Sequence, residues 1–238
     1  MQAVILAAGF GSRLGKITNG KPKSFLQINN ETLIERAVRL LHERGISDVH
    51  VVTGYKNELM EDKLKGKAVC HHNPLYFCTN VLASFSVAMT ALRDDFIFLH
   101  ADTIFETSIL DQLLAAKGDM VLPIDFKKVQ EEEMKVRVDQ HQNIVEISKE
   151  IPLELAHGEF MGLAKISQGV LDEVRNAVIE ELQSKKLLQS YFEGAIQNMI
   201  DKGATISSLD ISDKSWIEID FEEDYHKAVE LFNFEVTA

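Results

Sequence analysis

Residues 2–23 constrain the fold more than any other stretch, because an apolar run ends there in a glycine-containing loop rich in cations. Val4 to Ala8 form a short continuous apolar segment, which predicts a strand buried on both faces of a parallel sheet. Gly9 and Gly11 lack a Cβ, so they let the backbone turn sharply and bring N–H groups against an anion. The cations of this loop, which all precede the first acidic residue of the chain at position 31, are Arg13, Lys16, Lys21 and Lys23. In a chain with a formal net charge of -12, this excess predicts a phosphate-binding loop, and a plain strand-to-helix turn is the simpler alternative.

The spacing of the loop separates it from two other glycine-rich phosphate loops. The third glycine of the dinucleotide-binding fingerprint would fall on Leu14, and no Walker A sequence follows. The ordered positions are instead Leu6-Ala7-Ala8-Gly9-x-Gly11-Ser12-Arg13-Leu14, then Thr18 and Pro22-Lys23. This pattern resembles the LxAGxGxRL and following PK of the nucleoside-triphosphate transferase family, the sugar-phosphate and choline-phosphate nucleotidyltransferases. The resemblance implies catalytic roles for Arg13 and Lys23. It also implies a set of nucleotide-binding residues in the loop: Leu6, Ala7, Ala8, Gly9, Gly11, Ser12, Arg13 and Lys23.

Length and composition describe an ordinary soluble protein. With 238 residues, 45% of them hydrophobic and 26% charged, the chain can bury a substantial core. A sequence pI near 5.1 argues against a nucleic-acid-binding surface. No apolar run approaches the roughly 20 residues that span a bilayer, and no secretory signal pattern is visible. We therefore expect a cytoplasmic protein that binds neither nucleic acid nor membrane, and the sequence leaves a homodimer open.

Helical and strand patterns alternate along the chain. The expected helices cover residues 31–45, 57–64, about 80–92, 110–117, 169–183, 189–203 and 222–232. The expected strands cover residues 48–53, 68–71, 95–100, 120–124, 163–166 and 205–210. This alternation predicts an α/β fold, a Rossmann-like doubly wound mostly parallel sheet. Strands at 134–139 and 143–149 predict a hairpin in a small β lid insertion, about residues 125–165, within a single domain of residues 1–238. The acidic run 131–133 is typical of a solvated loop.

Two aspartates far apart in the sequence are candidate metal ligands. Asp102 follows the expected strand 95–100, at the sheet edge where ligands of open α/β folds bind. Asp220 closes the segment Trp216-Ile217-Glu218-Ile219-Asp220. The resemblance implies that these two carboxylates hold Mg²⁺, an ion that prefers oxygen ligands. Ala101 departs from the glycine that many family members carry before the first aspartate.

Two further groups of residues are candidates for substrate recognition. In the choline-phosphate cytidylyltransferase-like branch of the family, an Asn with a Ser four residues later helps to recognise the base and ribose, which implies such a role for Asn80 and Ser84. The expected nucleotide-binding residues also include Ala101, which precedes Asp102. Helix capping is the equally good alternative for Asn80. For the acceptor, the resemblance implies Lys149 from the ISKEI sequence, which would also be catalytic, and Glu159, Gly162 and Trp216. An aromatic cage for a quaternary ammonium group is a weaker alternative to core packing for Phe160, Tyr191, Phe192 and Trp216.

The resemblance implies a Mg²⁺-dependent cytidylyltransferase that transfers CMP from CTP to phosphocholine or 2-aminoethylphosphonate and releases pyrophosphate. The acceptor phosphate or phosphonate is already anionic near neutral pH, so the reaction needs no general base. The protein must instead position two mutually repelling anions and stabilise charge. A sugar-1-phosphate nucleotidyltransferase that uses UTP, GTP or dTTP is the alternative within the family. A non-catalytic nucleotide-sensing regulatory subunit is the alternative from another class, and the retained Arg13, Lys23, Asp102 and Asp220 disfavour it.

Overall fold

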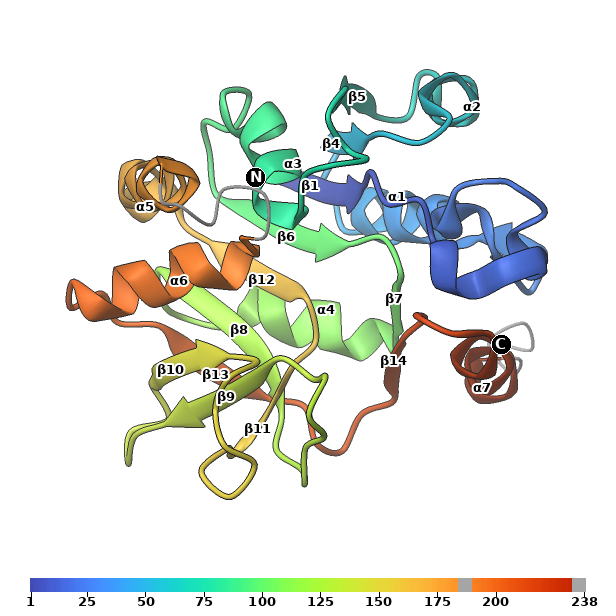
Figure 1. Ribbon diagram of the computed structural model, residues 1–238. Coiled ribbons are helices and arrows are strands. Elements are labelled where there is room, and N and C mark those ends of the chain that lie inside the picture. Colours follow the sequence, from blue (N-terminus) through green and yellow to red (C-terminus); the bar gives the residue numbers. More distant parts are fainter. Residues whose placement is uncertain (184–189, 233–238) are drawn as a thin grey trace.

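The computed structural model describes residues 1–183 and 190–232, which are built around a ten-stranded sheet (Figure 1). The spatial order of its strands is β10-β9-β11-β8-β12-β6-β1-β4-β5, and β13 pairs with β8. In this described part of the chain, the model contains no helix with the length and apolar character needed to cross a membrane.

One side of the sheet consists of four parallel strands from the N-terminal part of the chain. In spatial order they are β6 (Phe96–His100), β1 (Gln2–Ala7), β4 (Asp48–Thr53) and β5 (Val69–His72). The helices between these strands are α1 (Leu33–Glu43), α2 (Asn57–Leu64) and α3 (Val81–Met89). Because the carboxyl ends of parallel strands share one edge, the loops after β1 and β6 meet there.

The other side of the sheet mixes parallel and antiparallel strands. They are β8 (Met120–Asp125), β9 (Lys135–Val138), β10 (Ile144–Ser148), β11 (Gly158–Phe160), β12 (Leu163–Ile166) and β13 (Ser207–Asp210). The pairings make β10, β11 and β12 run against all the others, so seven of the ten strands point the same way. The predicted mostly parallel α/β sheet is therefore confirmed. β9, β10 and β11, from the segment expected to be an insertion, extend one edge of this same sheet.

Alternate residues of β1 enter two different cores, one on each face of the sheet. Val4 and Leu6 pack in a core with residues of α3, α5 (Leu171–Gln183) and α6 (Phe192–Asp201). Ala3 and Ile5 pack in a core with residues of α1 and α4 (Thr107–Ala115). Helices thus cover both faces, as Figure 1 shows, and β1 is apolar throughout because neither of its faces meets water.

A small second sheet, which the sequence did not predict, joins the two predicted metal ligands. β7 (Thr103–Phe105) pairs antiparallel with β14 (Trp216–Glu218), and the Ile219 N–H donates to the Asp102 carbonyl at 3.0 Å. The C-terminal helix α7 (Glu222–Phe232) follows β14. Ile219 and Phe232 are buried in a third core together with Leu14 from the N-terminal loop. This core holds the C-terminal segment against the loop.

Element boundaries differ from the prediction at a few places with local causes. The helix expected from residue 31 begins at Leu33, because β3 (Glu31–Thr32) pairs with β2 (Gln27–Ile28). Thr32 then caps α1 by accepting a hydrogen bond from the Glu35 N–H at 3.3 Å. α4 begins at Thr107, earlier than expected. The helix expected over 189–203 begins at Phe192, and residues 184–189 lie outside the described part.

Candidate active site

The N-terminal loop packs directly on Lys23. Gly11 has a φ of 69°, which disfavours other residues, at the start of the helical turn η1 (Ser12–Thr18). A Cβ at Gly11 would lie 2.9 Å from the Cβ of Lys23, the first residue of η2 (Lys23–Phe25). Glycine is therefore what lets the loop close on this lysine. The predicted nucleotide-binding residues exposed in the loop are Gly9, Ser12 and Arg13, and those buried at the end of β1 are Leu6, Ala7 and Ala8.

The Lys23 ammonium joins the two distant aspartates. Its Nζ lies 2.9 Å from Asp102 Oδ2 and 2.5 Å from Asp220 Oδ1, and the lysine side chain is only 12% exposed. Arg13 Nη1 lies 3.5 Å from the other oxygen of Asp220, and its guanidinium lies 5.5 Å from the centre of the Phe221 ring. The structure thus brings two of the four loop cations, Arg13 and Lys23, and both predicted metal ligands to one place.

Burial and neighbouring charges act in opposite directions on the central groups of this site. Burial lowers the pKa of Lys23, but Asp102 and Asp220 outweigh it and hold that pKa above its usual range. Burial likewise raises the pKa of Asp102, but the Lys23 ammonium and then His100 outweigh it and hold that pKa below its usual range. Both Lys23 and Asp102 are therefore charged at neutral pH.

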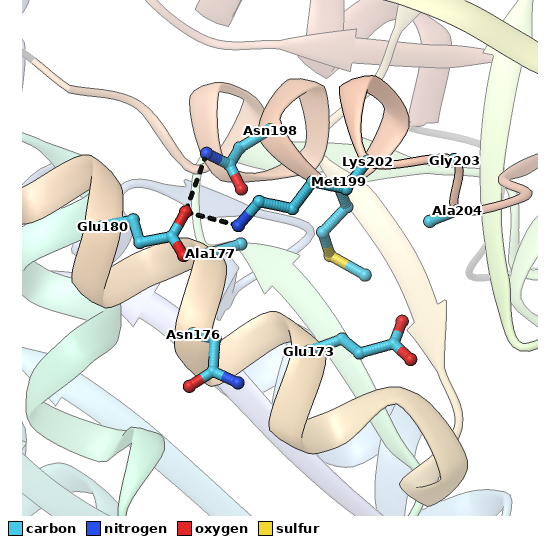
Figure 2. A pocket seen from close by; sticks show the side chains of 9 residues that line it. All are labelled: Glu173, Asn176, Ala177, Glu180, Asn198, Met199, Lys202, Gly203 and Ala204. Carbon is cyan, nitrogen blue, oxygen red and sulfur yellow. Dashed lines mark hydrogen bonds and ion pairs between the residues drawn. The ribbon is translucent and has the colours of Figure 1, made fainter.

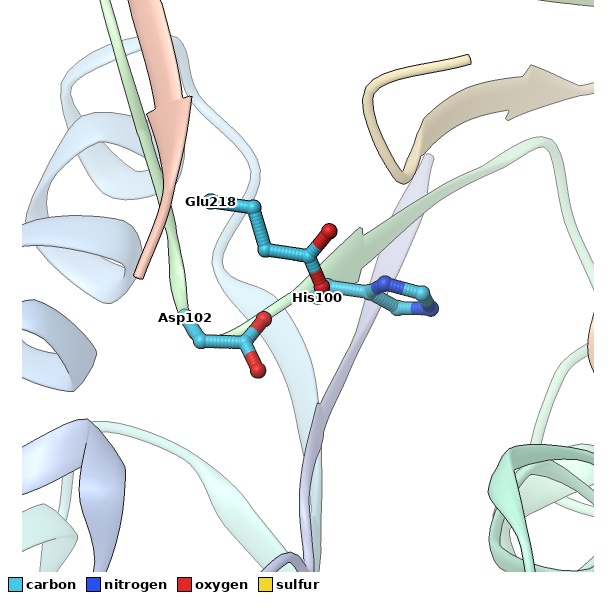
Figure 3. Close-up of side chains that lie close together, drawn as sticks. All are labelled: His100, Asp102 and Glu218. Atoms are coloured by element: carbon cyan, nitrogen blue, oxygen red, sulfur yellow. The ribbon is translucent and has the colours of Figure 1, made fainter. Parts of the chain in front are cut away.

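His100, Asp102 and Glu218 form a group in which one ligand atom of each lies within 4.8 Å of the others (Figure 3). Desolvation, followed by repulsion from Asp102 and Asp220, raises the pKa of Glu218 to about 8. Because Glu218 is an exposed residue, its position favours repulsion from Asp102 and Asp220 over desolvation as the main cause of the raised pKa. Among the described residues, Asp102 Oδ1 and His100 Nε2 are buried without a hydrogen-bond partner. An unsatisfied, ionised carboxylate oxygen beside further carboxylates is a donor set that fits a hard divalent cation.

The predicted base-recognition residues are held by local hydrogen bonds. The Asn80 side chain caps α3 by accepting from the Val81 N–H at 2.9 Å. Ser84 is buried, and its Oγ accepts from Asn73 Nδ2 at 3.0 Å. Ala101 donates its N–H to the Leu6 carbonyl at 3.1 Å, so the alanine is accommodated beside the end of β1. Capping accounts for the position of Asn80, and Ser84 lies beneath the loop that follows β5.

A second charged group, which we call the carboxylate–indole cluster, consists of Asp125, Glu133, Glu159 and Trp216. It surrounds the Lys127 ammonium, whose Nζ lies 2.7 Å from Glu159 Oε2, 3.5 Å from Asp125 Oδ2 and 3.6 Å from Glu133 Oε1. The same Nζ lies 5.2 Å from the centre of the Trp216 ring. Trp216 Nε1 donates to Asp125 Oδ2 at 3.1 Å, which fixes the indole against the carboxylate. Two predicted acceptor residues, Glu159 and Trp216, therefore share one ammonium group.

The other two predicted acceptor residues are Gly162, which lies beside His100, and Lys149, which lies beside Tyr191. A Cβ at Gly162, whose φ is 79°, would lie 2.8 Å from His100 Nδ1, so glycine allows this imidazole its position. The Lys149 Nζ lies 5.6 Å from the centre of the Tyr191 ring. Burial raises the pKa of Glu193, a buried carboxylate, while His100 and, more weakly, Lys149 lower it.

Two interpretations of the sequence are wrong. The four-membered aromatic cage does not form, because Phe160 and Phe192 are only 3% and 1% exposed and belong to a sheet core. The acidic run 131–133 is not wholly solvated, because Glu133 turns inward to the carboxylate–indole cluster.

Sequence reasoning also missed four residues of the site, namely His100, Asp125, Lys127 and Glu218. For Glu218 a signal existed: Trp216, Glu218 and Asp220 alternate with Ile217 and Ile219, which is the period of a strand with one polar face. The structure shows this alternation, since Ile219 is fully buried while Glu218 is exposed. Lys127 gave no such signal, because its partners come from three different strands and a loop.

A separate hollow lies between α5 and α6 (Figure 2). Its lining includes Glu180, which accepts from Asn198 Nδ2 at 3.2 Å and forms an ion pair with Lys202. The predicted site residues do not line this hollow.

Comparisons with known proteins identify the family of this chain. A family model described as the MobA-like NTP transferase domain matches residues 3–187. The chain is 28% identical over 255 residues to CTP:phosphoglutamine cytidylyltransferase of Campylobacter jejuni, covering 97% of this chain and 100% of that protein. It is 26% identical over 244 residues to CMP-5'-(3-aminopropyl)phosphonate synthase of Streptomyces rubellomurinus, covering 96% of this chain but only 38% of that longer protein.

A solved structure, that of CTP:phosphocholine cytidylyltransferase from Streptococcus pneumoniae, matches with a TM-score of 0.78 at 19% identity. The match covers 97% of this chain and 98% of the other, and at this identity it shows a shared fold. The matched family model covers more than half of the chain, including the N-terminal loop and the strand that leads to Asp102. The chain therefore belongs to the MobA-like NTP transferase domain family and is a nucleotidyltransferase.

Proposed function

We propose that this nucleotidyltransferase is a Mg²⁺-dependent cytidylyltransferase that transfers CMP from CTP to a small phosphorylated or phosphonate compound bearing an ammonium group. Phosphocholine and 2-aminoethylphosphonate are the acceptors we favour. The observation that carries the proposal is the Lys23 ammonium, which bridges Asp102 and Asp220 beside the glycine loop. The cytidylyltransferase and CMP-phosphonate synthase names of the two relatives support CTP as the nucleotide.

In the proposed reaction, an oxygen of the acceptor phosphate or phosphonate attacks the α-phosphorus of CTP. A new P–O bond forms, the bond from the α-phosphorus to the bridging oxygen breaks, and pyrophosphate leaves with that electron pair. The exposed Arg13 guanidinium can bind the leaving β- and γ-phosphates in a bidentate manner. Lys23 exchanges a carboxylate contact for the α-phosphate, and Lys149 orients the acceptor phosphate.

Asp102 and Asp220 are the residues that would hold Mg²⁺, with Glu218 beside them. When bound, this ion supplies positive charge to the phosphoryl oxygens of the nucleotide. The unsatisfied Oδ1 of Asp102 supports this assignment, because a buried anionic oxygen without a partner is otherwise unfavourable.

The carboxylate–indole cluster supports an acceptor with a cationic group. Carboxylates and an indole face are groups that bind ammonium ions, and an ammonium already lies among them in Lys127. A sugar 1-phosphate, the alternative acceptor, carries neutral hydroxyl groups at this end and supplies no positive charge to the cluster. We further propose that the protein acts in the cytoplasm as a single domain, with residues of about 125–165 forming the acceptor side.

The proposal is tested by measuring pyrophosphate release with CTP, UTP, GTP, ATP and dTTP crossed with several acceptors. These are phosphocholine, 2-aminoethylphosphonate, phosphoglutamine and glucose 1-phosphate, each with Mg²⁺ and with EDTA. Turnover that requires CTP, Mg²⁺ and an ammonium-bearing acceptor supports the proposal. Preference for glucose 1-phosphate with UTP or dTTP replaces it with the sugar-phosphate alternative. Binding of nucleotide without any turnover favours the nucleotide-sensing alternative.

A further inference from the structure

Lys127 places its ammonium in the carboxylate–indole cluster, although the residue itself is exposed. Its side chain is 38% exposed, whereas the side chain of its nearest partner, Glu159, is 9% exposed. The lysine lies in the segment between β8 and β9, where the neighbouring Phe126 N–H donates to Ser212 Oγ at 2.9 Å. The ammonium group thus contacts a buried carboxylate, although more than a third of the lysine side chain is exposed, which leaves it free to rotate toward water.

The cluster carries more negative charge than one ammonium compensates. Asp125, Glu133 and Glu159 all face the single Lys127 Nζ. Burial raises the pKa of Glu159 to about 7 and, although Lys127 lowers it, Glu133 and Asp125 raise it further. Loss of Lys127 without a replacement therefore leaves these carboxylates in mutual repulsion unless Glu159 takes up a proton, whereas exchange for another ammonium conserves the charge balance.

The cluster also adjoins the proposed reacting groups. Trp216 and Glu218 are two residues apart on β14, so their side chains lie on the same face of that strand. Trp216 donates to Asp125 of the cluster, whereas Glu218 lies with Asp102 and His100, so this face of β14 joins the two groups. A small acceptor whose phosphate lies at the Lys23 end of the site can therefore place its other end in the carboxylate–indole cluster.

From these contacts we infer that Lys127 is a tethered ammonium group that occupies the acceptor-cation position in the free protein and leaves when the acceptor's own ammonium enters. This inference rests on the proposed function, and it makes Lys127 a specificity-determining residue. An ammonium-bearing acceptor replaces the Lys127 ammonium with another positive charge, and Lys127 regains hydration and side-chain freedom in water. A neutral acceptor cannot replace the lost charge, so Lys127 stays in place and excludes it.

When Lys127 lies in the carboxylate–indole cluster, the acceptor cannot bind there. The apparent affinity for the acceptor is therefore lowered, because only the fraction of molecules in which Lys127 has left the cluster can bind it. We therefore expect Lys127→Met, which keeps most of the stem and removes the charge, to lower KM for phosphocholine at least about fivefold. The change falls on KM for the acceptor rather than on KM for CTP. Lys128→Met is the matched control, because it removes the same charge from an exposed neighbour outside the cluster.

A binding measurement tests the inference without any turnover. Choline chloride, which lacks a phosphate, is added to each variant at the ionic strength of a sodium chloride reference, and the melting temperature is recorded. We expect choline to stabilise Lys127→Met more than wild type or Lys128→Met. If Lys127→Met is too unstable to purify, Lys127→Gln provides the same comparison.

The outcomes separate this inference from the proposed function. Equal choline shifts in wild type and Lys127→Met, or a raised KM for phosphocholine, overturn the role of Lys127. A larger choline shift in Lys127→Met supports that role even where the pyrophosphate screen finds a different reaction. A negative pyrophosphate screen by itself overturns only the proposed function.

Discussion

The Nζ of Lys23 and Oδ1 of Asp220 form an ion pair of 2.5 Å between the N-terminal loop and the C-terminal segment. Asp102 shares the same ammonium at 2.9 Å, so Lys23 lies where the two proposed metal ligands and the glycine loop meet. This relationship makes Lys23 the first residue to test.

Lys23→Ala is expected to lower turnover at least about 100-fold, because it removes a positioned charge from the reacting phosphoryl group. The measurement is kcat from pyrophosphate release at saturating substrates. Lys67→Ala, which removes an exposed lysine elsewhere, is the control and keeps the wild-type rate. An unchanged kcat in Lys23→Ala removes this lysine from the mechanism.

Gly11→Ala is expected to destabilise the protein by about 2–3 kcal/mol and to weaken CTP binding. Its φ of 69° strains an alanine, and the new Cβ would lie 2.9 Å from the Cβ of Lys23. Urea unfolding gives the change in the free energy of unfolding, and calorimetry gives the dissociation constant for CTP.

Gly45→Ala separates the two causes of that effect. Gly45 has a φ of 76° but no atom within 4 Å of an added Cβ, so alanine there meets backbone strain alone. We expect a smaller loss of stability, about 1 kcal/mol, with unchanged CTP binding. Equal losses of stability and of CTP binding in both variants would show that the contact with Lys23 has no effect.

Removal of Mg²⁺ is expected to abolish turnover, and Mg²⁺ added back is expected to restore it, because Asp102 and Asp220 present the carboxylate oxygens that this ion prefers. A second readout is thermal: with CTP present, Mg²⁺ should raise the melting temperature of wild type but not of Asp220→Asn. A Mg²⁺-dependent shift that survives in Asp220→Asn and in Asp102→Asn places the ion elsewhere.

His50 and His71 make stability depend on pH. His50 Nδ1 and His71 Nε2 lie 2.9 Å apart, and burial lowers the pKa of both imidazoles, with His50 lowering that of His71 further. Below the unfolded value of about 6.5, the unfolded chain takes up protons that the folded protein does not, so the free energy of unfolding falls as pH falls. For each unit by which folding lowers a histidine pKa, the free energy of unfolding falls by about 1.4 kcal/mol once the pH is below both the folded and the unfolded pKa.

Urea unfolding between about pH 7.5 and 5.5 measures the slope of the free energy of unfolding against pH. His71→Gln should flatten it, whereas His42→Gln, at an exposed position, should not. A slope that is identical in wild type and His71→Gln assigns the pH dependence to other groups.

Much of the fold was readable from local patterns. The strands β4 and β12, which are short, partly apolar segments beside Gly54 and Gly162, have the predicted boundaries, and so do the helices α2 and α7. β7 and β14 were missed because each has only three residues, too few for a period, and they exist through pairing with each other.

The sequence by itself determined the glycine loop, its surrounding cations and the separate aspartates, because those features are consecutive residues or residues at strand ends. Only the tertiary structure decided what they meet. The pairing of β7 with β14 sets Asp102 beside Asp220, and three strands and a loop converge to surround Lys127 with three carboxylates and an indole. Such contacts join residues far apart in the chain, and local periodicity carries no information about which distant charges fold against one another.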